Sequence, residues 1–453
     1  MNRYKLRANY DIESIVAKKK KDKMIVDVPM LSNGNLNYGL KDVKKRLYKE
    51  SIYPTEIGFD IMSIATMVYM ADTRIERLKH GQDSWTREIE LEIPVSNVIL
   101  WENQISIIER MLKFLTGDLW KITFSHRSWN FSIPEEIGEK TNKYNKVSLF
   151  SGGMDSLIST INLMESKQNT LLISHAGEGL TKNAQQNIIN HFDNKYPDIL
   201  HTWMDLWMVF PNNYIPEGGD DNNTRSRSFL FIGYGVFAMT GLSNVSELMV
   251  PENGLIALNV PLDETRIGSF STRTTHPFYL SLWNELLSNL ELNIHVKNPY
   301  WNKTKGEMAA ECKNKDVLYD TMKISFSCSS PGKARWRGLS PQHCGYCVPC
   351  IIRRAAMYKA FGKDGTLYTE KSILKMQKKS SEGIGIQLRS FQYAIDKIKK
   401  DKRRALLYIH KPGPLPQDEV YLKELADTYV RGLVEVDNFI QANLKKEDKN
   451  NDI

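Results

Sequence analysis

The residues that decide the fold are VSLFSGGMDSLIST, at positions 147–160. A short apolar run leads directly into Ser151-Gly152-Gly153-Met154-Asp155-Ser156, and apolar residues at helical spacing follow. Adjacent glycines allow a tight turn and a close approach to an anion, and the two serines add hydroxyl donors. A helix N-terminus then directs free N–H groups at the bound group. The pattern predicts a strand, a phosphate-binding loop and a helix, with a pyrophosphate group as the ligand.

The loop differs from two common phosphate-binding motifs, because neither the G-x-x-x-x-G-K-[ST] nor the G-x-G-x-x-G spacing is present. A glycine pair can also serve only as a turn, but the full S-G-G-x-D-S string between a strand and a helix is more specific than that. Asp155 has two open roles. It could orient a magnesium ion, or it could cap its own helix, since aspartate is favoured in a first helical turn.

Beyond the loop, short apolar runs alternate with amphipathic stretches. Strands are expected at 147–150, 170–174 and 201–207, and a helix at 229–239. Such alternation is typical of parallel strands joined by helices. We therefore expect an α/β fold with a doubly wound parallel sheet.

The flanking regions have different patterns. Strand-like alternation at 23–30 and 86–95, with helical spacing over 57–78, predicts an N-terminal α+β extension at residues 1–145 that ends in a polar linker from 130. The loop and the cysteines occupy residues 146–358. Residues 359–453 are expected to be helical, with a break at 411–417, a helix at 419–444 and a charged tail that frays.

Length and composition indicate an ordinary globular protein. The 453 residues leave room for about three domains of roughly 150 residues each. The net charge is +8, from 61 basic and 53 acidic residues, and the basic runs at 18–23 and 397–404 leave contact with nucleic acid open. No secretion signal is recognisable, and the longest apolar run, 229–242, is too short for a membrane helix. We expect a cytoplasmic protein with no membrane partner.

Four of the five cysteines follow a C-x15-C-x2-C-x2-C pattern, at Cys328, Cys344, Cys347 and Cys350. Four thiolates satisfy tetrahedral zinc and leave no open position, so the pattern predicts a structural zinc site. An iron–sulfur cluster or buried free thiols are the alternatives. Cys312 lies outside the pattern and is expected in the core, while His343 could substitute as a ligand.

The loop resembles that of the PP-loop (N-type) ATP pyrophosphatases, and with the cysteine pattern it resembles the 7-cyano-7-deazaguanine synthase (QueC) family. The family's S-C...C-G-x-C-x2-C-x2-R pattern is matched by Ser327-Cys328, Cys344-Gly345, Cys347, Cys350 and Arg353. NKTKGEM, at 302–308, is similar to the family's T-K-A-E-I segment, with Gly306 in place of alanine. Arg227-Ser228-Phe229-Leu230 is similar to its R-N-L segment. The resemblance covers about residues 146–358.

The resemblance implies a PP-loop fold and adenylation of 7-carboxy-7-deazaguanine by ATP with magnesium, followed by capture of the acyl-adenylate by ammonia. It implies that ATP is bound by Ser151, Gly152, Gly153, Asp155 and Ser156, and that catalysis involves Ser151, Asp155, Ser156 and Lys305. An exposed helix lysine is the alternative for Lys305. Arg227 and Arg353 are weaker candidates for phosphate or carboxylate contact, with surface ion pairing as their alternative.

The extensions on both sides resemble those of the QueC-like proteins of anti-phage defence operons, such as the four-gene Qat system. This resemblance implies partner proteins from the same operon, one of which could supply the accepting amine. A polar string, Ser271-Thr272-Arg273-Thr274-Thr275-His276, could line the channel for that amine or form an ordinary loop. Two other functions stay open: modification of tRNA, and a nucleotide-binding scaffold of a defence complex.

Overall fold

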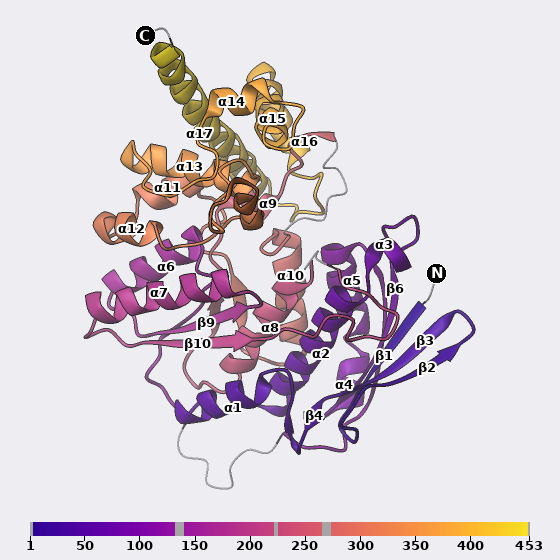
Figure 1. Cartoon of the computed structure of the whole chain (residues 1–453). Helices are drawn as coiled ribbons and strands as arrows, with labels where there is room; N and C mark the ends of the chain where they lie inside the picture. Colours follow the sequence, from indigo (N-terminus) through magenta and orange to yellow (C-terminus); the bar gives the residue numbers. More distant parts are fainter. Residues whose placement is uncertain (1–2, 132–139, 222–224, 265–272, 452–453) are drawn as a thin grey trace.

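Two five-stranded sheets organise the chain in a computed structural model, which describes residues 3–131, 140–221, 225–264 and 273–451 (Figure 1). The first sheet has the order β2-β3-β1-β6-β7. Its strands are β1 (Arg3–Asn9), β2 (Val16–Lys20), β3 (Lys23–Pro29), β6 (Glu88–Val95) and β7 (Leu119–His126). A two-stranded ribbon, β4 (Leu31–Ser32) and β5 (Asn35–Leu36), follows β3. The helices of this part are α1 (Leu40–Lys49), α2 (Glu56–Arg74), α3 (Arg77–His80), α4 (Val98–Glu102) and α5 (Ile105–Thr116).

This N-terminal sheet is mostly parallel, which the expectation of an α+β extension did not include. Only β2 pairs antiparallel, with β3, whereas β3, β1, β6 and β7 run in one direction. The strands expected at 23–30 and 86–95 are confirmed as β3 and β6. Alternation of apolar and polar residues indicates which residues of a strand are buried, and β6 does bury every second residue. The alternation does not indicate whether the neighbouring strand runs parallel or antiparallel.

The second sheet is parallel throughout and has the order β10-β9-β8-β11-β12. Its strands are β8 (Lys146–Leu149), β9 (Thr170–Ala176), β10 (His201–Trp207), β11 (Glu247–Met249) and β12 (His295–Lys297). The three strands expected after the first part are thus confirmed. From β8, the next two strands, β9 and β10, add to one side of β8, and the last two, β11 and β12, lie on its other side. The strand order therefore reverses at β8. In open parallel sheets, the crevice at such a reversal is where ligands bind.

Helices cover both faces of this sheet. They are α6 (Met154–Glu165), α7 (Gly179–Lys195), α8 (Arg227–Met239) and α10 (Pro277–Asn289). The short helix α9 (Gly254–Leu258) packs instead in the core of the C-terminal helices. Successive residues of the fully buried β9 face opposite sides: Leu172 packs in one core with residues of α6 and α7, whereas Leu171 and Ile173 pack in another with residues of α8 and α10. That second core continues into the N-terminal part, where α2 packs against α8 (Figure 1). Of the expected linker, residues 132–139 lie outside the described residues.

The rest of the chain is mostly helical, as expected. Its helices are α11 (Lys305–Ala310), α12 (Lys315–Met322), α13 (Val348–Phe361), α14 (Ile373–Lys378), α15 (Ile386–Lys400), α16 (Ala405–Tyr408) and α17 (Glu419–Asn451), with 3-10 turns at Pro331–Arg337 and Lys402–Arg404. The tail predicted to fray continues α17 as far as Asn451. Among the described residues, no helix is both long and apolar enough to cross a membrane.

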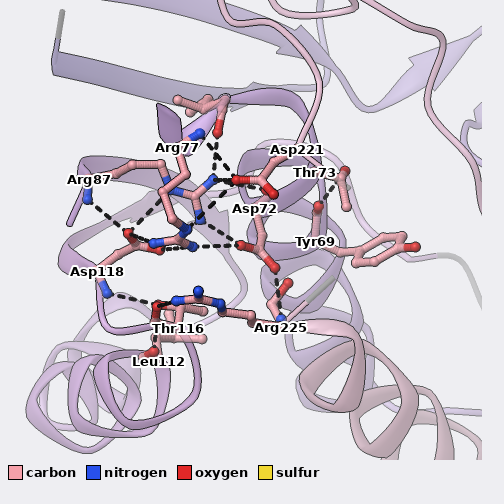
Figure 2. Close-up of polar contacts among 12 residues, drawn as sticks. Tyr69, Asp72, Thr73, Arg77, Arg87, Leu112, Thr116, Asp118, Asp221 and Arg225 are labelled. Atoms are coloured by element: carbon pink, nitrogen blue, oxygen red, sulfur yellow. Dashed lines mark hydrogen bonds and ion pairs between the residues drawn. The ribbon is translucent and has the colours of Figure 1, made fainter. Parts of the chain in front are cut away.

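A buried ionic network joins the N-terminal part to the start of α8 (Figure 2). Arg87 donates to Asp118 at 2.7 Å and to Asp72 at 2.6 Å, and Asp72 also accepts the backbone N–H of Ser226 at 2.8 Å. Arg77 adds a second pair of bonds to Asp118. Burial alone would raise the pKa of Asp118, but the two arginines hold it below its usual value. The network therefore fixes the residues that lead into α8.

We expect Asp118→Asn to lower the free energy of unfolding by about 3 kcal/mol or more, because it leaves two buried guanidinium groups short of a carboxylate. Denaturant unfolding measures the change. The control is Glu88→Gln, which removes a partly exposed pairing with Arg3 and should change stability by only about 0.5 kcal/mol. Equal effects of the two variants would contradict the role given to the network.

Candidate functional site

The loop between β8 and α6 has the predicted form. Gly152 has a φ of +79°, which side-chain-bearing residues rarely adopt, and Gly153 is the residue that precedes α6. Ser156 Oγ lies 3.1 Å from Ser151 Oγ, and Ser151 Oγ accepts the N–H of Gly153 at 3.3 Å. The two hydroxyl groups and the first N–H groups of α6 are therefore gathered at the carboxyl end of β8.

Two segments distant in sequence form hydrogen bonds with the backbone of this loop. Gln185 of α7 donates its amide to the carbonyl of Ser151 at 3.2 Å, and its side chain packs against Gly152. On the other side, the N–H of Phe326 donates to the carbonyl of Gly152 at 2.9 Å. Phe326 lies two residues before Cys328, so the cysteine region is attached directly to the loop.

Asp155 and Lys305 form a buried ion pair. Lys305 Nζ lies 3.0 Å from Asp155 Oδ2, and the two side chains are only 7% and 10% exposed. The alternative of an exposed helix lysine is therefore wrong. Oδ2 also accepts the side-chain amide of Asn253 at 2.9 Å, and among the described residues no side chain caps α6 with a hydrogen bond, so the capping role of Asp155 is not seen. Its other oxygen, Oδ1, is buried without a hydrogen-bond partner among the described residues.

The two arginines of the predicted site occupy different places. Arg227, the first residue of α8, donates to the carbonyl of His175 at 3.0 Å, next to the carboxyl end of β9. Burial and the charge of Arg227 lower the pKa of His175 to about 3, so this imidazole is neutral at pH 7. Arg353 is fully buried and donates to the hydroxyls of Ser325 and Ser327. Arg353 thus supports the segment behind the loop, and neither arginine forms an ion pair with any residue that the structure describes.

Glu252 is a site residue that the sequence analysis missed. Its carboxylate accepts the hydroxyl of Thr275 at 2.6 Å, and the next residue, Asn253, binds Asp155. Burial, together with the charge of Asp155, raises the pKa of Glu252 to about 7. No motif in the sequence around Glu252 marks it as functional. Only its position in the structure, beside Asp155 and Lys305, indicates that it belongs to the candidate site.

The raised pKa predicts a pH-dependent stability. At low pH both the folded and unfolded forms hold the proton of Glu252; between the ordinary value of 4.5 and about 7 only the folded form does. The stabilisation is thus fully present below about pH 4.5, falls as the pH rises from there to about 7, and is absent above that. From about pH 5 to 8, we expect the wild type to lose about 2 kcal/mol relative to Glu252→Gln in denaturant unfolding.

Glu247→Gln is the matched control for this measurement, because the carboxyl of Glu247 pairs with Lys297 at the surface. The same pH trend in both variants would show that the effect does not come from Glu252.

The four cysteines of the predicted metal site lie together. Their sulfur atoms are within 4.8 Å of one another, and Cys328 lies 4.0 Å from Cys347. Backbone N–H groups point at the sulfurs: that of Cys344 is 3.2 Å from Cys328 Sγ, and that of Cys347 is 3.3 Å from Cys344 Sγ. Such an arrangement could hold a metal ion such as zinc. Four sulfurs this close favour one shared ion over an iron–sulfur cluster, whose cysteines bind separate irons.

The neighbouring candidates stay outside the cluster. Cys312 is buried in the core beside α6, as expected. His343 accepts the N–H of Ser327 and is not part of the metal-binding set. In the polar string, Ser271 and Thr272 lie outside the described residues, Thr275 binds Glu252, and His276 accepts the N–H of Phe278 at the start of α10.

Loss of one cysteine should remove both the metal and stability. We expect Cys347→Ser to lose zinc and to unfold more easily, because a metal present at a thousandfold over its dissociation constant stabilises the folded state by about 4 kcal/mol. Metal analysis and thermal unfolding are the measurements, with Cys312→Ser as the control that retains its metal. Full folding of the wild type without metal would contradict a structural zinc.

Comparison of the chain with models of known protein families gives no match, and the search of the curated proteins also finds none. The function therefore has to be argued from the residues and their geometry.

Proposed function

We propose that the protein is an ATP-dependent ligase of the QueC-like, PP-loop kind. It activates the carboxylate of a 7-deazaguanine by adenylation, with release of pyrophosphate, and passes the acyl group to a nitrogen nucleophile. By the same resemblance we propose that it acts in anti-phage defence, in the cytoplasm, with proteins of its own operon as partners.

The observation that carries the proposal is the buried pair of Lys305 and Asp155 at the start of α6. Removing a lysine and an aspartate from water is costly, and stability alone rarely justifies it. The pair stands beside a glycine turn at the point where the strand order reverses, which is where an open parallel sheet binds nucleotides. In this proposal, the ammonium group of Lys305 binds a phosphate group of ATP beside the N-terminus of α6.

The reaction needs negative charge to be neutralised as it develops. A carboxylate oxygen of the deazaguanine attacks the α-phosphorus of ATP, the bond from that phosphorus to the β-phosphate oxygen breaks, and pyrophosphate leaves. The N–H groups of the loop and α6, the hydroxyls of Ser151 and Ser156, and Lys305 would bind the leaving pyrophosphate. The nitrogen nucleophile then attacks the acyl carbon, loses a proton and expels AMP.

The metals have separate roles in this proposal. Oδ1 of Asp155, which has no hydrogen-bond partner in the described part of the chain, is the kind of oxygen ligand that Mg²⁺ prefers. A bound Mg²⁺ would supply positive charge to the phosphates. Zinc in the four-cysteine cluster would act structurally, because no position is left for a substrate. Through Phe326 and Gly152 it would steady the back of the loop.

The decisive test is incubation with ATP, Mg²⁺ and 7-carboxy-7-deazaguanine, with ammonium or the co-expressed operon proteins as acceptors. We expect AMP and pyrophosphate in equal amounts, and Lys305→Ala should lower the rate by about 100-fold. Lys303→Ala is the matched control, since Lys303 lies two residues away and pairs with Glu311 at the surface. Intact mass spectrometry of the partner proteins identifies the acceptor.

Other outcomes would point elsewhere. Formation of ADP and phosphate, or no turnover with the operon partners present, would contradict the proposal. Turnover only with tRNA, weakened steeply by salt, would indicate an RNA-modifying enzyme. ATP binding and partner assembly without any turnover would indicate a scaffold.

A further inference from the structure

The carboxylate of Glu435, on the C-terminal helix α17, is buried against the segment that carries Lys305. Its side chain is only 4% exposed, and it lies in a part of the chain that the family resemblance does not cover. Oε2 accepts the hydroxyl of Thr304 at 2.6 Å, and Oε1 accepts the backbone N–H of Gly306 at 2.8 Å. Glu435 thus holds the residues immediately before and after Lys305.

Gly306, the residue after Lys305, leaves space for the carboxylate of Glu435 because it has no side chain. A Cβ on Gly306 would lie 2.5 Å from the carboxyl carbon of Glu435, which is far inside van der Waals contact. The glycine therefore removes the one methyl group that would prevent Glu435 from reaching the backbone. This gives a physical reason for a glycine at the position where the related segment has alanine.

Other contacts of α17 fix the same short helix. Arg431 donates to Glu307 at 2.9 Å and to the carbonyl of Asn302 at 2.8 Å, and Lys359 of α13 lies 3.2 Å from Glu435. Glu307 in turn completes a capping box with Thr304. The first turn of α11 is thereby held by α17 on one side, while the Lys305 side chain extends on the other to Asp155.

We propose that Glu435 is a positioning residue of the nucleotide site, which sets the backbone of Lys305 so that its ammonium group reaches Asp155 and the phosphates. This role rests on the proposed adenylation activity. It makes α17 part of the scaffold of the active site. Glu435 itself touches neither nucleotide nor substrate.

The first test is a kinetic double-mutant cycle on pyrophosphate release. Misplacing a reacting group by about 1 Å can cost about 100-fold, so Glu435→Gln should lower kcat by about 10- to 100-fold with little change in KM for ATP. In a Lys305→Ala background, Glu435→Gln should have no further effect, because its action passes through Lys305. A full additional loss in that background would overturn the proposal, since it would mean a general structural role.

Two further variants separate positioning from folding. Glu435→Ala combined with Gly306→Ala fills the vacated space with a methyl group, so the protein should fold, but it should remain slow because both hydrogen bonds are missing. Asp437, about half a turn from Glu435 on α17, pairs with Lys399 of α15. Asp437→Asn removes only that pairing and should keep the wild-type kcat. Wild-type kcat in the double variant would overturn the proposal.

Crystal structures of the wild type and Glu435→Gln give a readout that needs no activity. We expect Lys305 Nζ to leave Asp155 Oδ2 in the variant; an unchanged ion pair would overturn the positioning role. If the ion pair is lost but the wild type releases no pyrophosphate, the proposed function has failed and the positioning role stands.

Discussion

A lysine removed from water must have its charge balanced, and in this protein that constraint acts at the start of α6. Lys305 meets one oxygen of Asp155, which is also bound by Asn253, and the neighbouring backbone is held by Glu435. These residues come from four separate segments of the chain. Their convergence means that the second sheet, the segment after β12 and the C-terminal helix must all be correctly placed before the site exists.

The same electrostatic logic operates at the junction with the N-terminal part. Arg77 and Arg87 are buried among the carboxylates of Asp72, Asp118 and Asp221. Asp72 also accepts the backbone N–H of Ser226, just before α8. Since α8 begins with Arg227, the network also determines where that guanidinium meets the end of β9. The N-terminal part therefore helps to position α8 beside the candidate site, although the family pattern of the loop and the cysteines covers only about residues 146–358.

Local sequence signals predicted local structure well. The strand, glycine turn and helix at 147–160 formed as expected, because turn geometry and helix initiation depend on residues a few positions apart. The strands β3, β6, β9 and β10 followed from their apolar patterns. The direction of the N-terminal strands did not, since strand pairing depends on distant segments. The tail of α17 was expected to fray on account of its charges, yet the helix that packs against α13 carries it on to Asn451.

What the sequence by itself determined is the chemistry available at two places: hydroxyls and flexible backbone in the loop, and four thiols in 23 residues. Both depend on spacing within a single segment. Only the tertiary structure decided that Lys305 is buried, that Arg353 lies behind the loop, that Glu252 lies beside Asp155, and that Glu435 contacts the residues on either side of Lys305. Asn253 lies 98 residues from Asp155, and Glu435 lies 129 from Gly306. Contacts over such separations are selected by the packing of whole elements, which no short stretch of residues encodes.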